Sequence, residues 1–225
     1  TVLFQWCHSI GLETLREIAG AKEAELTPLC PAHLKRRSPF FHCMTKRASC
    51  EFIEQHKDRP FFLKVSTHNI HVPRSPNPKF LGKSECGVRG DTIMEFDWTV
   101  GQVLDALDRL KLTDNTLVIL TSDNGGALDD NGPDTVHGIG SKEANNGHMF
   151  NGVLKGTKGS CFEGGTRLPF IARWPGHVRS GVSDELICQV DMLASFAALT
   201  GQSLVPADGP DSLNVLPALL GEKCD

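Results

Sequence analysis

Two residues that offer oxygen ligands, Asp123 and Asn124, lie just past the C-terminal end of the short apolar run in TLVILTSDNGG (116–126). A carboxylate beside an amide carbonyl suits a hard divalent cation such as Ca²⁺ or Mg²⁺. The same residue types also favour an ordinary turn, because Asp, Asn and Gly all accept turn conformations. On this stretch alone the turn is the favoured interpretation, since short motifs often occur without the function they suggest.

Two other stretches carry groups that act on anions. His68 and His71 follow the apolar run FFLKVST, and a histidine can serve as an acid, a ligand or an anion-binding cation. Lys155 and Lys158 lie in a glycine-rich stretch that ends at Pro169, where either lysine can neutralise a bound anion. The glycine spacing differs from that of a Walker A phosphate loop, which argues against nucleotide binding. Taken alone, each of these residues is also typical of a surface loop.

Other polar clusters are predicted to be surface. Asp129 and Asp130 lie in a long loop rich in Gly, Asn and Asp (127–152), with no buried strand to fix their geometry. Loops of this length are uncommon unless they are functional or disordered, so a role facing the substrate is a reasonable expectation for it. The histidines and cysteines of the first 50 residues match no zinc-finger spacing.

The elements that would position these residues follow from the apolar pattern. Buried strands are predicted at 61–67, 116–121 and 168–174. Amphipathic helices are predicted at 89–110 and 184–200, with a less clear one at 12–26. Gly201 is expected to stop the second of these helices. A helix followed by a strand is typical of a parallel sheet, whose carboxyl edge is where such sheets bind their ligands.

Composition limits the classes of protein that need to be considered. The 225 residues are 40% hydrophobic with a net charge of −4, which suffices for one sizeable core and gives no electrostatic reason to bind nucleic acid. No apolar run approaches the roughly 20 residues of a membrane span. Eight cysteines form no CxxC pair, so free thiols are expected, with one or two disulfides if the protein is exported. Residue 1 is Thr and no signal segment opens the sequence, so we expect it to begin within a longer protein.

The order of the motifs is more specific than any one of them. FFLKVSTHNIHVP, then EFDWTVGQVLDALDRL, then NTLVILTSDNGG, then LKGTKGSCFEGGTRLPFIARWPG resembles the sulfatase family. The resemblance implies an α/β fold of the alkaline-phosphatase-like type, a mixed and mostly parallel sheet flanked by helices, here incomplete. It divides the chain into a poorly readable segment, 1–50, and part of a sulfatase catalytic domain, 51–225.

The resemblance also assigns roles to four residues. Asp123 and Asn124 match the pair that supplies half the ligands of the catalytic cation, usually Ca²⁺, which reverses the preference for a simple turn. His71 matches the histidine that contacts the sulfate ester and can protonate its leaving oxygen. Lys158 matches the lysine that holds the sulfate group. These roles agree with the chemistry, since a cation and a lysine stabilise charge on the transferring group and a protonated histidine neutralises the departing oxygen.

The sequence departs from the family pattern in three places. It contains no Cys/Ser-x-Pro-x-Arg, the motif whose first residue becomes the formylglycine nucleophile, no early Asp-Asp pair and no Gly-Lys-x-His segment. We therefore expect a fragment of a sulfuric ester hydrolase that does not turn over sulfate esters by itself.

Alternatives remain open at this point. One is a pseudoenzyme that binds anionic sugars, and another is a phosphatase or phosphodiesterase of the same superfamily. The resemblance implies a sulfated carbohydrate or aryl sulfate as substrate and an exported protein, in the periplasm, outside the cell or in the lysosome.

Overall fold

The computed structural model describes residues 2–4, 40–71, 74–127, 146–205 and 207–222. Its strands are β1 (Val2–Phe4), β2 (Phe62–Lys64), β3 (Leu117–Thr121) and β4 (Phe170–Arg173). Its helices are α2 (Phe40–His56), α3 (Gly87–Arg109), α5 (Glu163–Thr166), α6 (Met192–Leu199) and α7 (Leu216–Leu219), with the 3-10 turns η1 (Thr113–Asn115) and η2 (Gln189–Asp191).

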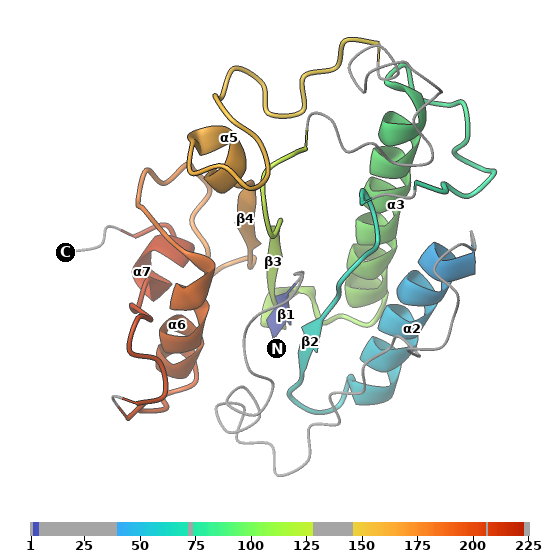
Figure 1. Ribbon diagram of the computed structural model, residues 1–225. Coiled ribbons are helices and arrows are strands. Elements are labelled where there is room, and N and C mark those ends of the chain that lie inside the picture. The colour runs from blue at the N-terminus through green and yellow to red at the C-terminus, as the bar shows by residue number, and fades with distance from the viewer. Residues whose placement is uncertain (1, 5–39, 72–73, 128–145, 206, 223–225) are drawn as a thin grey trace.

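The strands form one mixed sheet in the order β2-β1-β3-β4. β1 pairs in parallel with both β2 and β3, whereas β4 runs antiparallel to β3. Helices α2 and α3 lie on one side of this sheet, and α6 and α7 lie on the other (Figure 1). The result is the three-layer α/β arrangement that the alternation of helix and strand predicts.

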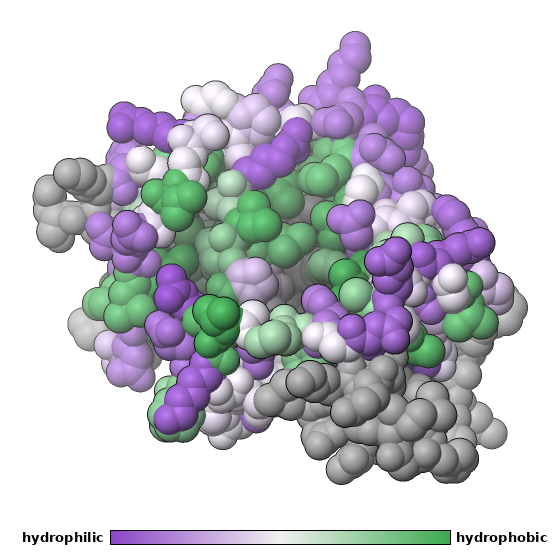
Figure 2. Space-filling model, turned by 90° about the horizontal axis from the view of Figure 1, so that it is seen from above, coloured by the Kyte–Doolittle hydropathy of each residue, from purple (hydrophilic) through white to green (hydrophobic). Residues whose placement is uncertain are grey.

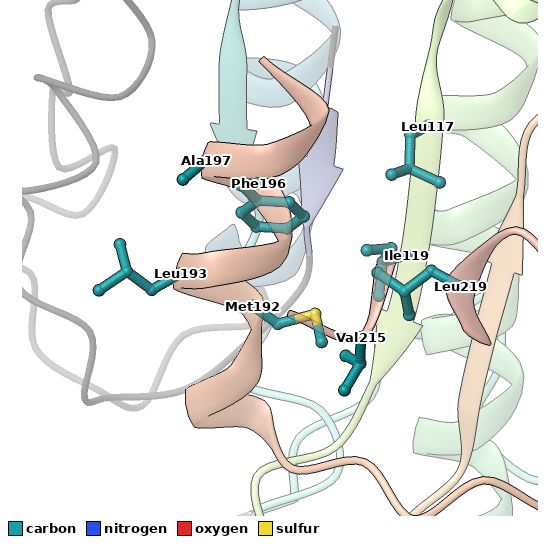
Figure 3. Close-up of a cluster of buried hydrophobic side chains, with 8 residues drawn as sticks. All are labelled: Leu117, Ile119, Met192, Leu193, Phe196, Ala197, Val215 and Leu219. Atoms are coloured by element: carbon teal, nitrogen blue, oxygen red, sulfur yellow. The ribbon is translucent and has the colours of Figure 1, made fainter. Parts of the chain in front are cut away.

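The central strand β3 joins the two layers because its side chains alternate between the two faces. Leu117 and Ile119 pack against α6 and α7 in a cluster that also contains Phe196 (Figure 3). Val118 faces the other way and belongs to a second cluster, formed with β2, α2 and α3. The strand is therefore covered on both faces, which explains its unbroken apolar sequence.

The longest helix confirms the prediction made for 89–110. α3 begins at Gly87, and its apolar side chains Val103 and Leu107 are buried in the cluster that also contains Val118 of β3. Asp91, itself buried, accepts hydrogen bonds from the backbone N–H groups of residues 82, 83 and 84 at 2.8, 3.1 and 2.8 Å. This carboxylate fixes the loop that leads into the helix.

Two predictions were wrong in part. The strand at 168–174 was expected to be buried, yet β4 carries the exposed side chain of Ile171, with 58% of its surface accessible. Phe170 and Ala172 pack on the cluster around Met192 and Phe196, which we call the α6 cluster. Ile171, between them, faces the opposite side of the strand, which is uncovered.

The helix expected over 184–200 begins later. Residues 184–188 are irregular, and α6 starts at Met192 after η2. Leu186 is 96% exposed, so the apolar period at the start of this stretch does not mark a buried face. The end was predicted correctly, because Gly201 adopts a positive φ of 70° just past the helix.

The helix predicted at 12–26 and the Asp129-Asp130 pair lie outside the described residues. Among the helices that the structure describes, none combines the length and the apolar character that crossing a membrane requires.

Candidate functional site

The candidate residues gather at the carboxyl edge of the parallel strands. β2 and β3 both run parallel to β1, so their carboxyl ends lie at the same edge of the sheet. His71 follows β2, and Asp123 and Asn124 follow β3 within a few residues. Figure 2 looks down on the molecule from above and shows an apolar hollow in the middle of the view, ringed by hydrophilic side chains.

The residues after β3 form a bend that we call the Asp-Asn turn (residues 122–126). Within it, the Ser122 hydroxyl donates to the Asn124 carbonyl at 3.0 Å, and the Asn124 amide nitrogen donates to the Gly125 carbonyl at 3.0 Å. The amide oxygen of Asn124 is therefore the atom left for a cation. Asp123 is exposed, and its carboxylate makes no hydrogen bond or ion pair with any other residue that the structure describes.

The Asp-Asn turn is joined by backbone hydrogen bonds to a second segment, the lysine loop (residues 155–160). The Lys158 N–H donates to the Gly126 carbonyl at 3.0 Å. The Gly125 N–H donates to the carbonyl of Gly165, at 3.0 Å, in the short helix that follows the loop. The structure thus brings the predicted cation ligands and the predicted sulfate-binding lysine to neighbouring positions.

Glycine is required at this junction because the two backbones touch. A Cβ at Gly125 would lie 1.8 Å from the Gly164 carbonyl oxygen, and a Cβ at Gly164 would lie 2.2 Å from that of Gly156. Gly125 does not have a positive φ, so its role is the close approach of chains rather than the turn conformation that its sequence suggests.

Asn151 is a residue of this junction that the sequence did not indicate. Its amide oxygen accepts from the Gly126 N–H at 2.9 Å, and its amide nitrogen donates to the carbonyls of Gly126 and Gly156, both at 3.1 Å. In the sequence, Asn151 precedes a glycine and has the appearance of an ordinary turn residue.

The structure also distinguishes between the two lysines. The Lys155 ammonium lies 4.2 Å from the centre of the Phe162 ring, in a cation–π contact. Lys158 is exposed, and its ammonium has no hydrogen-bond or ionic partner among the described residues. Lys158 is therefore the better placed of the two to meet an anion from solvent.

His71 is held at the same edge by a separate group of contacts. The backbone N–H of His71 donates to the His68 carbonyl at 2.9 Å, and the centres of the two imidazole rings lie 6.3 Å apart. Asn69 donates from its side chain to the Thr92 carbonyl of α3 at 3.2 Å. The carboxyl of Glu95 accepts from Asn69 and from the backbone N–H of residue 77, at 3.5 and 3.3 Å, so it tethers the loop on both sides of His71.

Glu95 is buried, with 2% of its surface exposed. Desolvation raises the pKa of its carboxyl above the usual value of 4.5, and the hydrogen bonds from residue 77 and Asn69 only partly oppose this shift.

The donors of the Asp-Asn turn fit a divalent cation in kind. A carboxylate and an amide oxygen are hard ligands, but Ca²⁺ takes about six to eight of them. No group of three or more His, Cys, Asp or Glu side chains suited to a metal occurs in the part of the chain that the structure describes. These residues thus supply part of a coordination sphere.

An apolar cavity of about 30 Å³ lies between α3, β3 and the residues just past the end of β2. It is lined mainly by valine and leucine, including Val65, Val100 and Leu120, with Thr67 and Thr99 as the polar members. It adjoins the strand ends that carry the site residues.

Comparison with known proteins shows the family of the chain. A model of the Sulfatase family matches residues 34–202, which is most of the chain. The chain belongs to the sulfatase family. The sulfatase N-acetylgalactosamine-6-O-sulfatase of Bacteroides thetaiotaomicron is 47% identical over 171 residues, covering 76% of this chain and 32% of that protein. Human arylsulfatase A is 35% identical over 211 residues, which cover 94% of this chain and 38% of that protein. The chain thus spans about a third of the length of these curated relatives.

Solved sulfatase structures confirm the predicted alkaline-phosphatase-like fold. One, from work on glycosaminoglycan metabolism by Bacteroides thetaiotaomicron, has a TM-score of 0.74 and 46% identity, covering 80% of this chain and 36% of its own. A Pseudoalteromonas sulfatase has a TM-score of 0.68 and 29% identity, and the match covers 81% of this chain and 34% of that one.

Proposed function

We propose that this sulfatase-family chain forms part of the site of a sulfuric ester hydrolase. The observation that carries the proposal is the hydrogen bond from the Lys158 N–H to the Gly126 carbonyl, 3.0 Å long, which joins the lysine loop to the Asp-Asn turn. Hydrolysis of a sulfate ester needs a positively charged side chain that binds the sulfate oxygens and a cation that stabilises the charge of the transferring group. This junction holds the segments that carry the two kinds of group next to each other.

Each residue has a distinct role in the proposed reaction. Lys158 binds the sulfate oxygens and holds the ester at the edge of the sheet. Asp123 and Asn124 would hold a divalent cation, Ca²⁺ by family resemblance, and that cation would supply positive charge to stabilise the transferring sulfuryl group. As a nucleophile that these residues do not supply forms a bond to sulfur, the bond from sulfur to the ester oxygen breaks, and the leaving oxygen takes a proton from the imidazolium of His71.

The covalent nucleophile of the family is formylglycine, made from the Cys or Ser of a Cys/Ser-x-Pro-x-Arg motif. That motif does not occur in these 225 residues. The proposed activity therefore needs a nucleophile in addition to the groups described, and we predict no turnover of sulfate esters by the 225 residues alone.

We propose a sulfated carbohydrate as the substrate class. Two observations support it: the 47% identity to a protein named as an N-acetylgalactosamine-6-O-sulfatase, and the likeness, at 29% identity and a TM-score of 0.64, to a protein solved with a neocarrahexaose. We further propose that the protein acts outside the cytoplasm, in keeping with the family.

Ligand binding tests the proposal without requiring turnover. The ¹H–¹⁵N spectrum of the chain would be recorded while 4-nitrophenyl sulfate is added in the presence of CaCl₂. We expect shifts centred on the amides of residues 157–159 and 123–126, and their loss in Lys158→Ala. Lys57→Ala is the matched control, because it removes the same charge from an exposed turn before β2, at the opposite edge of the sheet.

Either of two results would overturn the proposal: an unchanged response in Lys158→Ala, or an equal loss in Lys57→Ala. A parallel titration with 4-nitrophenyl phosphate compares the two esters. Clearly tighter binding of the phosphate would favour a phosphatase of the same superfamily over a sulfatase.

A further inference from the structure

Asn151 connects three segments of the candidate site through one side chain. It bonds to both backbone groups of Gly126, which ends the Asp-Asn turn, and to the carbonyl of Gly156, in the lysine loop. The Lys158 N–H donates to the same Gly126 carbonyl that receives the Asn151 amide. One carbonyl oxygen is therefore shared between Asn151 and the lysine loop.

The residue before Asn151 contacts helix α3, and this contact holds Asn151 in place. The ring of its neighbour Phe150 lies under the Arg89 guanidinium, 3.9 Å from ring centre to guanidinium carbon, and Arg89 is 3% exposed near the start of α3. A Cβ at Gly126 would lie 2.7 Å from the Phe150 ring and 2.9 Å from the Asn151 amide oxygen. The segment 150–151 thus packs directly on the Asp-Asn turn, with α3 behind it.

We infer that Asn151 is a positioning residue that fixes the distance between the cation ligands and the sulfate-binding lysine. The inference rests on the proposed function. Asn151 suits this role because one planar amide both accepts from and donates to Gly126 while donating to Gly156, so the two segments cannot slide past each other while these bonds are kept. If this junction opens, Asp123 and Lys158 lose their fixed separation, although each stays on its own segment.

The inference predicts a linkage between the two ligands. A cation held by Asp123 and Asn124 attracts an anion at Lys158 only if the two sites stay close, because charge interactions weaken with distance and are screened by water. We expect Ca²⁺ to raise the affinity for inorganic sulfate roughly fivefold in the wild type. In Asn151→Ala this enhancement falls towards onefold, while each ligand alone binds nearly as before.

Amide hydrogen exchange and paired titrations test the inference together. In Asn151→Ala, the amides of Lys158 and Gly125 should exchange about fivefold to tenfold faster, as expected when the bonds that close the junction are lost. Amides of α6 should be unchanged. Asn151→Asp keeps the acceptor for the Gly126 N–H but sets a carboxylate oxygen against the carbonyl oxygens of Gly126 and Gly156, so its exchange should be at least as fast as that of alanine. Asn214→Ala is the control, because among the described residues its side chain bonds only to the Leu216 N–H at the start of α7.

The outcomes separate the inference from the proposed function. Unchanged exchange at Lys158, or equally faster exchange throughout the chain, would overturn the positioning role. Faster local exchange with an intact fivefold linkage would overturn it as well, since the junction would then open without affecting the ligands. If the wild type binds neither Ca²⁺ nor sulfate, the proposed function fails and the positioning role fails with it, whatever the exchange rates show.

Discussion

Replacement of Gly125 by alanine should destabilise the protein through a contact that the sequence does not reveal. The new Cβ would lie 1.8 Å from the Gly164 carbonyl oxygen and 2.8 Å from its carbon. Both atoms belong to the backbone, so no side-chain rotation relieves the clash. The two segments must separate by more than 1 Å to restore ordinary van der Waals distances, and the bond from the Gly125 N–H to Gly165, now 3.0 Å, breaks.

The magnitude follows from these two losses. Overpacking of a close contact costs about 1–3 kcal/mol, and a lost backbone hydrogen bond adds about 1 kcal/mol. We therefore expect Gly125→Ala to lower the free energy of unfolding by about 2–4 kcal/mol. For a chain of this length the midpoint of thermal unfolding should fall by roughly 5–15 °C.

Gly101→Ala is the matched control. A Cβ at Gly101 meets nothing within 4 Å, and the residue lies inside α3. Alanine should therefore stabilise the helix by about 0.5–1 kcal/mol. The two variants would be compared by circular dichroism during thermal and urea unfolding. If Gly125→Ala unfolds at the same midpoint as the wild type, the close packing of the Asp-Asn turn on the lysine loop is refuted.

Three further substitutions test the core, the helix entry and the buried acid. Met192→Ala should lower the free energy of unfolding by about 2–5 kcal/mol, because Met192 is fully buried in the α6 cluster; a midpoint equal to that of wild type would contradict this packing. Asp91→Asn should cost about 1–3 kcal/mol in urea unfolding, since one of the two accepting oxygens becomes an NH₂ donor that cannot accept from a backbone N–H, and the bonds that remain lose the charge of the acceptor. For Glu95, whose pKa is raised by burial, the stabilising effect of protonation is full below pH 4.5 and is lost as pH rises through the pKa of the folded state. The stability of Glu95→Gln relative to wild type should therefore rise over that range and then level off, whereas a pH-independent difference would rule out the shift.

The elements that the sequence predicted well are those decided by burial on a regular period. The spacing of Val103 and Leu107 is sufficient to identify α3, because the helix buries one face along its whole length. β3 was equally clear, since a strand covered on both faces must be apolar throughout.

The wrong predictions concern elements whose environment depends on the rest of the sheet. β4 begins with the apolar run Phe-Ile-Ala, but it lies at the end of the described sheet and buries only one face. Leu186 fits the period of α6 in sequence, yet it lies ahead of the helix and is exposed. The local sequence pattern does not encode the exposure of Ile171 or of Leu186, because the burial of a side chain depends on which elements of the fold pack against it.

The site was predictable only where its residues have distinctive chemistry. The sequence motifs indicated Asp123, Asn124, His71 and Lys158. They did not indicate Asn151, since an asparagine before a glycine is also a common turn pair, and its contacts join segments that lie 25 residues apart.

Paramagnetic relaxation with Mn²⁺, which accepts the same oxygen ligands as Ca²⁺, tests the central claim most directly. Line broadening in the ¹H–¹⁵N spectrum reports which amides lie near the bound ion. We predict broadening of the amides of residues 123–126 and, because of the hydrogen bond to Gly126, of Lys158 as well, with both effects abolished by Asp123→Ala. Broadening that persists in Asp123→Ala, or that reaches the Asp-Asn turn without reaching Lys158, would contradict a shared cation and sulfate site.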